Sequence, residues 1–122
     1  MPKLVEMDPL VSLFAQMEEA TGPIVLLNVF TVAPEEADRL LEAWTSDAAI
    51  MKRQPGFISA QLHRGVRGSA FLNYAEWESM SDFKRAFFDP EFQLAMKNYP
   101  PSTVTSPHVF RKLAVPGICA GS

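Results

Sequence analysis

The sequence is poor in cysteine, in long apolar runs and in clusters of charge of one sign. Its one cysteine, Cys119, has no partner for an internal disulfide, in keeping with a reducing compartment. Apolar runs such as Ile24–Leu27 are far shorter than the ~20 residues of a membrane-spanning helix, and Glu6 and Asp8 interrupt any signal-peptide core. We therefore expect a soluble, cytoplasmic protein. The 11 basic and 14 acidic residues are interspersed, which gives nucleic acids and anionic membranes no electrostatic support as partners.

The short motifs of several enzyme classes are also missing. No nucleophile elbow or glycine-rich phosphate loop is present, since Gly65–Gly68 fits a hairpin turn rather than a phosphate cradle. The two histidines, His63 and His108, have no metal-ligand spacing to the carboxylates. The sequence therefore has no recognisable binding motif for a dinucleotide cofactor. Flavin and haem need no short motif and remain open at this point.

What is present is typical of one small globular domain: 122 residues, 48% apolar and 20% charged. Capping residues, proline positions and hydrophobic periodicity predict helices at about 8–20, 34–54 and 79–99, and strands at 23–32, 57–64, 69–78 and 103–113. After the N-terminal helix the order is β-α-β-β-α-β. This order predicts an α+β fold of the ferredoxin-like type with an antiparallel four-stranded sheet. We divide the chain into an extension (1–22), the main domain (23–115) and a tail (116–122).

The predicted strands are apolar on both faces. In the first strand Leu26 and Phe30 have one parity, and Leu27 and Val29 have the other. Two helices cover only one face of such a sheet, and a face in contact with water would be polar. The same face of a second copy would provide the cover, so a homodimer is predicted. The alternative is that the N-terminal helix covers this face within one chain.

Polar residues interrupt the apolar strands at a few positions. Asn28 lies within the most apolar stretch, where an unpaired amide would cost roughly 1–3 kcal/mol. Asn73 and Trp77 share one parity, which is also that of Phe71, and project about 13 Å apart along the strand. These side chains predict a pocket for a flat, oxygenated ring compound. The alternative is that the amides bond to nearby backbone while Trp77 fills the core.

The histidines give a weaker signal. His63, on the second strand of the main domain, is a further candidate for substrate binding. Most lone histidines are surface or core residues, and the same reading applies to His108.

Three segments resemble the antibiotic-biosynthesis monooxygenase family over residues 23–115. They are Val29–Val32 followed by Pro34, then Gln54–Phe57, and most specifically Asn73–Ser79 (NYAEWES). The resemblance implies a dimeric α+β barrel with a cavity between sheet and helices. It also implies oxidation of electron-rich phenols by molecular oxygen without metal, flavin or haem.

The same resemblance assigns roles to individual residues. Asn73 and Trp77 match the asparagine and tryptophan of the family motif, and would donate hydrogen bonds to substrate oxygen. Phe83 stands where quinone-forming members have a tyrosine. Haem-degrading relatives have residues like Asn28 and Trp77, but Met96 stands where their proximal histidine is expected.

We therefore expect a cofactor-independent monooxygenase that oxidises a small electron-rich aromatic or enolisable compound with molecular oxygen. Asn73 and Trp77 would be catalytic, and Asn28, Phe71 and His63 would bind substrate. The alternatives are a haem-binding or haem-degrading relative and a non-catalytic small-molecule-binding dimer.

Overall fold

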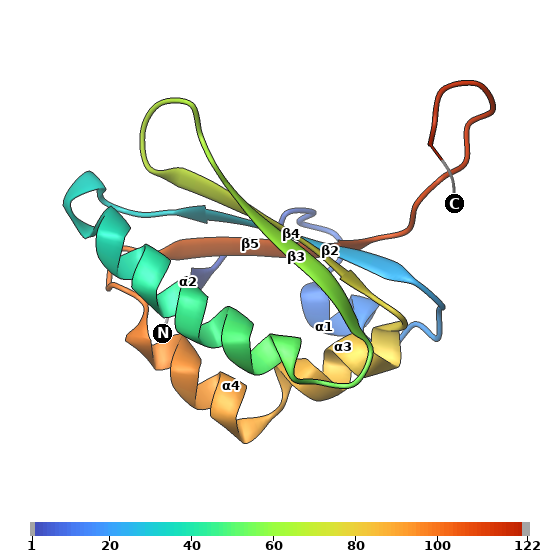
Figure 1. Cartoon of the computed structure of the whole chain (residues 1–122), viewed down its shortest axis with the longest axis horizontal. Coiled ribbons are helices and arrows are strands. Elements are labelled where there is room, and N and C mark those ends of the chain that lie inside the picture. The colour runs from blue at the N-terminus through green and yellow to red at the C-terminus, as the bar shows by residue number, and fades with distance from the viewer. Residues whose placement is uncertain (1, 121–122) are drawn as a thin grey trace.

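A computed structural model describes residues 2–120 (Figure 1). From α1 onward the elements follow the predicted order, and most ends of the main-domain elements agree to within a few residues. The strands are β1 (Lys3–Leu4), β2 (Ile24–Thr31), β3 (Phe57–Arg64), β4 (Ala70–Trp77) and β5 (Val104–Phe110). The helices are α1 (Leu13–Gln16), α2 (Ala37–Lys52), α3 (Met80–Phe87) and α4 (Pro90–Ala95), with short 3-10 helices at Pro34–Glu36 and Met96–Asn98.

The sheet has the strand order β1-β5-β2-β4-β3. The ferredoxin-like α+β architecture is confirmed, but the prediction of a four-stranded antiparallel sheet was wrong, because β1 adds a fifth strand parallel to β5. The backbone of this edge is joined by Lys3 N–H donating to Thr103 O and Val5 N–H donating to Thr105 O. Two paired residues are too few to show a period-two pattern in the sequence.

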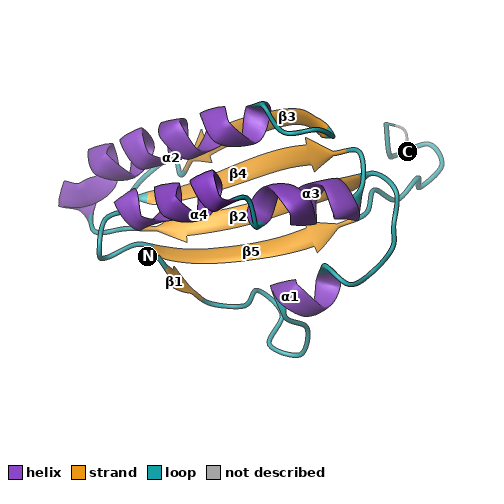
Figure 2. Cartoon of the chain, turned by 90° about the horizontal axis from the view of Figure 1, so that it is seen from below, coloured by secondary structure: helices purple, strands orange, loops and turns teal. Residues whose placement is uncertain are grey.

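Helices α2, α3 and α4 all lie against one face of the sheet, here called the inner face (Figure 2). Their starts follow local chemistry. The Ser79 hydroxyl accepts from the Asp82 N–H at the start of α3, and the Asp89 carboxylate accepts from Glu91 N–H, with Pro90 at the first position of α4. A hydrophobic core lies between these helices and the sheet. The fully buried Trp77 and Phe83 belong to it.

The N-terminal helix is shorter than predicted. Asp8 forms a turn, with its carboxylate accepting from Leu10 N–H, and the helix begins only after Ser12, whose hydroxyl accepts from Ala15 N–H. The Gln16 side chain anchors α1 to β5, since its Oε1 accepts from Val109 N–H. The predicted longer helix was wrong because Asp8 bonds to its own local backbone instead of capping a helix.

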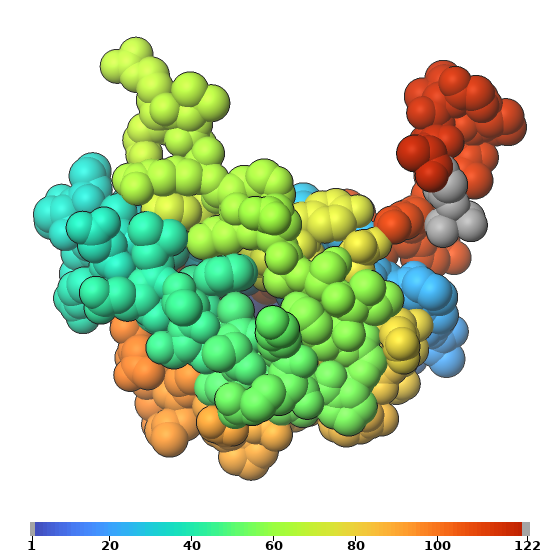
Figure 3. All heavy atoms as spheres, in the orientation of Figure 1, coloured from blue at the N-terminus to red at the C-terminus, as the bar shows by residue number. Residues whose placement is uncertain are grey.

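The opposite, outer face of the sheet is apolar at its centre and carries none of the described helices. Residues paired across strands point to the same face, so Leu27 lies beside Tyr74 and Val29 beside Leu72 on this outer face. The turn between β3 and β4 and residues 113–120 project from the body of the molecule (Figure 3). Within residues 2–120, no helix has the length and apolarity needed to cross a bilayer.

Candidate functional site

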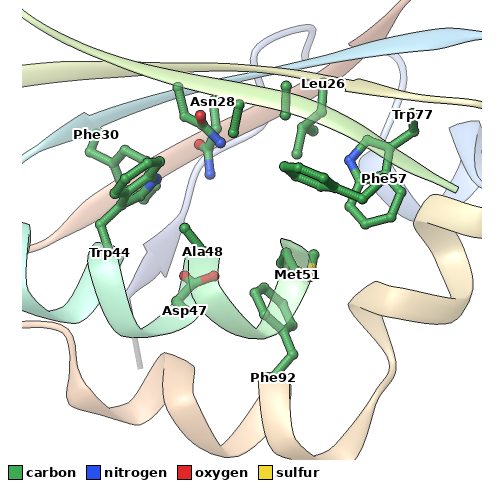
Figure 4. A pocket seen from close by; sticks show the side chains of 13 residues that line it. Leu26, Asn28, Phe30, Trp44, Asp47, Ala48, Met51, Phe57, Trp77 and Phe92 are labelled. Carbon is green, nitrogen blue, oxygen red and sulfur yellow. The ribbon is translucent and has the colours of Figure 1, made fainter. Parts of the chain in front are cut away.

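A cavity lies between the inner face of the sheet and helices α2 and α4 (Figure 4). It has a larger lobe of about 360 Å³ and a smaller lobe of about 60 Å³. The two lobes adjoin, because both are lined by Leu26, Asn28, Phe30, Asp47, Met51 and Phe92. Asn73 and Trp77 line the smaller lobe. The cavity walls are mainly aromatic and aliphatic with a few polar groups, which is the usual composition of a site for a small organic ligand.

Two asparagine side chains lie next to each other on the sheet side of this cavity. Asn28 of β2 and Asn73 of β4 are direct partners in the antiparallel register, and both face inward. The Thr105 hydroxyl donates to Asn28 Oδ1 at 2.6 Å, which fixes the amide and leaves its two N–H donors for the cavity. Asn73 Oδ1 is buried and has no hydrogen-bond partner among the described residues.

Trp77 closes one end of the smaller lobe. Its side chain is 1% exposed and meets Phe57 edge to face at a centroid distance of 5.4 Å. Its indole Nε1–H is buried and, within residues 2–120, has no acceptor. Buried polar atoms in folded proteins are nearly always paired, so orphaned atoms on a cavity wall indicate where a ligand would bind. A third orphan, Thr103 Oγ1, does not line the cavity.

The sequence analysis did not identify an ionisable pair, Asp47 and Tyr99, that lies at this cavity. Asp47 of α2 lines both lobes, and the buried Tyr99 hydroxyl donates to its Oδ2 at 2.5 Å. Burial raises the pKa of Asp47 from 3.8 to about 6, although the hydrogen bond from Tyr99 acts in the opposite direction. Burial and the neighbouring carboxylate raise the pKa of Tyr99, which stays neutral. A signal for Asp47 existed in the sequence, because it follows Trp44 by three residues and precedes Met51 by four, on the apolar stripe of its helix.

Two of the predicted binding residues do not line the cavity. His63 is paired with Leu72 and lies on the outer face, so the expectation that it binds the same ligand as Asn73 is not met. Phe71 does face inward, but it is 2% exposed and packs with Phe30 in a separate core cluster. The structure therefore brings together Asn28, Asn73 and Trp77 and leaves out His63 and Phe71.

The N-terminal segment forms part of the wall. Leu4, Leu13 and Phe14 line the larger lobe, so α1 lies at the cavity and not over the outer face. Met96 also lines this lobe, whereas no histidine of the described residues does. The lining therefore does not fit haem held by a proximal histidine.

The sequence model of the antibiotic biosynthesis monooxygenase family matches residues 23–98, more than half of the chain. The chain belongs to this family.

Individual relatives agree with this assignment. The chain is 40% identical to tetracenomycin-F1 monooxygenase of Streptomyces glaucescens over 72 residues, which is 56% of this chain and 62% of that enzyme. SnoaB, a cofactor-independent oxygenase of Streptomyces nogalater, superimposes with a TM-score of 0.68 at 25% identity, over 80% of this chain and 99% of SnoaB. Rv0793 of Mycobacterium tuberculosis shares the fold, with a TM-score of 0.66 at 13% identity over 78% of this chain and 99% of that protein. The residues that match the family model, 23–98, include β2, β3, β4 and the NYAEWES segment of the present chain.

Proposed function

We propose that the protein is a cofactor-independent monooxygenase that oxidises an electron-rich aromatic or enolisable compound with molecular oxygen. The observation that carries the proposal is the pair of orphaned polar atoms on the cavity wall, Asn73 Oδ1 and Trp77 Nε1. The relation to tetracenomycin-F1 monooxygenase and SnoaB supports the same class of reaction. For an anthrone-like substrate, one CH₂ group and one O₂ molecule would give one C=O group and one water.

The polar groups suit such a reaction. An electron-rich anion reduces oxygen itself, and the protein needs to hold that anion and stabilise the peroxide that forms on it. The Asn28 amide and the Trp77 indole N–H are fixed donors in a site with mainly apolar walls, where hydrogen bonds to developing negative charge are strong. The aromatic walls, such as Phe57 and Phe92, suit a flat ring system.

Oxygen consumption tests the proposal. Purified protein would be assayed against anthrones, hydroquinones and 1,3-diketones, with Trp77→Phe beside the wild type. We expect uptake by the wild type and at least a tenfold loss of kcat/KM in Trp77→Phe, because the indole N–H is removed. Tyr74→Phe, on the same strand but on the outer face, is the matched control and should retain the activity. No uptake with any of these compounds would count against the proposal.

We also propose that the protein is a homodimer joined through the outer face. Leu27, Val29 and Leu72 occupy the central strands there, away from the sheet edges. A second copy related by a two-fold axis would match this patch with itself. Leu27→Asp should shift the molar mass from dimer to monomer in light scattering, while Asp38→Asn on the exposed side of α2 should not. A monomeric wild type would refute this interface.

A further inference from the structure

Within the described part of the chain, one charged side chain, Asp47, lines the cavity, and it is not among the proposed donors to substrate oxygen. Asp47 rises from α2 on the side of the cavity opposite the Asn28 amide, which hangs from the sheet (Figure 4). Among the described residues that line either lobe, Asp47 alone carries a formal charge. An ionised carboxylate placed among aromatic rings costs folding free energy, and such a cost is typical of groups that serve a function.

Among the described residues, the side chains that the surrounding elements present to Asp47 are neutral. β2 presents Asn28, and β4 presents Asn73 and Trp77 to the same lobe. α4 presents Phe92 and Gln93, and Tyr99 follows the second 3-10 helix. No lysine, arginine or histidine of residues 2–120 lines the cavity, so no cation neutralises the carboxylate.

We propose that Asp47, held in place by the Tyr99 hydroxyl, is the base that takes the proton from the bound substrate. The inference rests on the proposed monooxygenase function and names its proton acceptor. In an anthrone-like substrate the C–H bond of the ring methylene breaks, and the proton goes to the free carboxylate oxygen of Asp47. The electron pair moves through the ring to the carbonyl oxygen, which becomes the oxyanion. The Asn28 N–H groups lie on the other side of the cavity and donate to that oxyanion.

Hydrogen bonding and burial suit Asp47 to this role. Tyr99 occupies Oδ2, so Oδ1 is the oxygen left to accept a proton. A base is most effective when its pKa is near the working pH, and burial moves the pKa of Asp47 from 3.8 to about 6. The neutral Asp47 that results can return the proton to the peroxide anion formed after oxygen adds to the substrate carbanion. This return of the proton restores the Asp47 carboxylate.

The test separates proton removal from oxygen chemistry. Anthrone would be incubated with the protein in D₂O without oxygen, and deuterium at the ring methylene followed by NMR. We expect the wild type to accelerate exchange over buffer, and Asp47→Asn to slow the protein-catalysed exchange by about 10²–10⁴-fold, the usual contribution of a positioned base. Asp38→Asn, an exposed aspartate on the same helix, is the matched control.

Two further variants exclude a merely structural effect. Tyr99→Phe removes the donor that lowers the pKa of Asp47, so the pH midpoint of the exchange rate should move upward while catalysis persists. Asp47→Ala should regain exchange when formate is added, because formate can act as the missing carboxylate. Circular dichroism would confirm that each variant is folded.

The exchange and oxygen-uptake experiments distinguish failure of this inference from failure of the proposed function. Exchange that depends on Asp47 supports the inference, even if the wild type then consumes no oxygen and the proposed monooxygenase function fails. Oxygen uptake that depends on Trp77 but is unchanged in Asp47→Asn supports the function and overturns the inference. The inference is likewise overturned if the wild type does not accelerate the exchange.

Discussion

Replacing Asp47 by asparagine should stabilise the protein at neutral pH while it removes the proposed base. The folded state holds this carboxyl with a pKa of about 6, whereas the ordinary value is 3.8. Between these two values the folded state binds more protons than the unfolded state, so the free energy of unfolding falls as pH rises from about 4 to 6. The difference of about 2 pKa units corresponds to roughly 3 kcal/mol, at about 1.4 kcal/mol per unit.

Asparagine has nearly the same shape, and its Oδ1 can accept from Tyr99, but it has no charge to bury. Compared with the wild type, Asp47→Asn should therefore be equally stable at pH 4 and up to about 3 kcal/mol more stable at pH 7.5. Urea denaturation at pH 4, 5.5 and 7.5, at one protein concentration, measures this difference. Asp38→Asn serves as the control for the loss of a carboxylate from the same helix. A stability difference that does not change with pH, or a variant that is less stable at pH 7.5, would refute the reasoning.

Three further predictions concern the framework around the cavity. Leu13→Ala should lower the free energy of unfolding by about 2–5 kcal/mol in urea, because this fully buried side chain packs α1 onto the core; an effect below 1 kcal/mol would mean that α1 is weakly docked. Gly56→Ala should lower the thermal midpoint, because Gly56 has a φ of +86° and an added Cβ would lie 2.3 Å from the Asp82 carboxyl; an unchanged midpoint would contradict this backbone conformation. Ser79→Ala should cost about 1 kcal/mol in urea denaturation through loss of the α3 cap, whereas Ser46→Ala, at an exposed serine within α2, should cost little. Equal effects of the two serine substitutions would contradict the capping role.

The helices and strands of the main domain were predictable because their signals are local. Asp89-Pro90 starts α4 through a side-chain cap and a fixed proline φ, and both are properties of neighbouring residues. The N-terminal segment was less predictable because one local signal there is compatible with two structures. Asp8 has the residue type of a helix cap, and only the folded chain shows that it closes a turn while Ser12 caps a shorter helix.

The position of His63 shows how a single register shift changes which side chains of a strand face inward and which face outward. Counting by twos from the inward-facing Phe57 places His63 on the inner face as well. The structure has a register shift between Phe57 and Ser59, after which Leu62 pairs with Asn73 and faces inward. His63 is thereby turned to the outer face. Nothing in the residue types from Phe57 to Arg64 marks this bulge.

The sequence by itself determined the α+β order, the capped helices and the candidates Asn28, Asn73 and Trp77, because strand parity and residue type are properties of short segments. Only the tertiary structure decided that Asn28 and Asn73 are cross-strand partners and that Thr105 orients the first of them. It also decided that Asp47 meets Tyr99, 52 positions further along the chain, inside the cavity. Register, burial and the raised pKa of Asp47 arise from contacts between distant segments, and a linear pattern does not contain them.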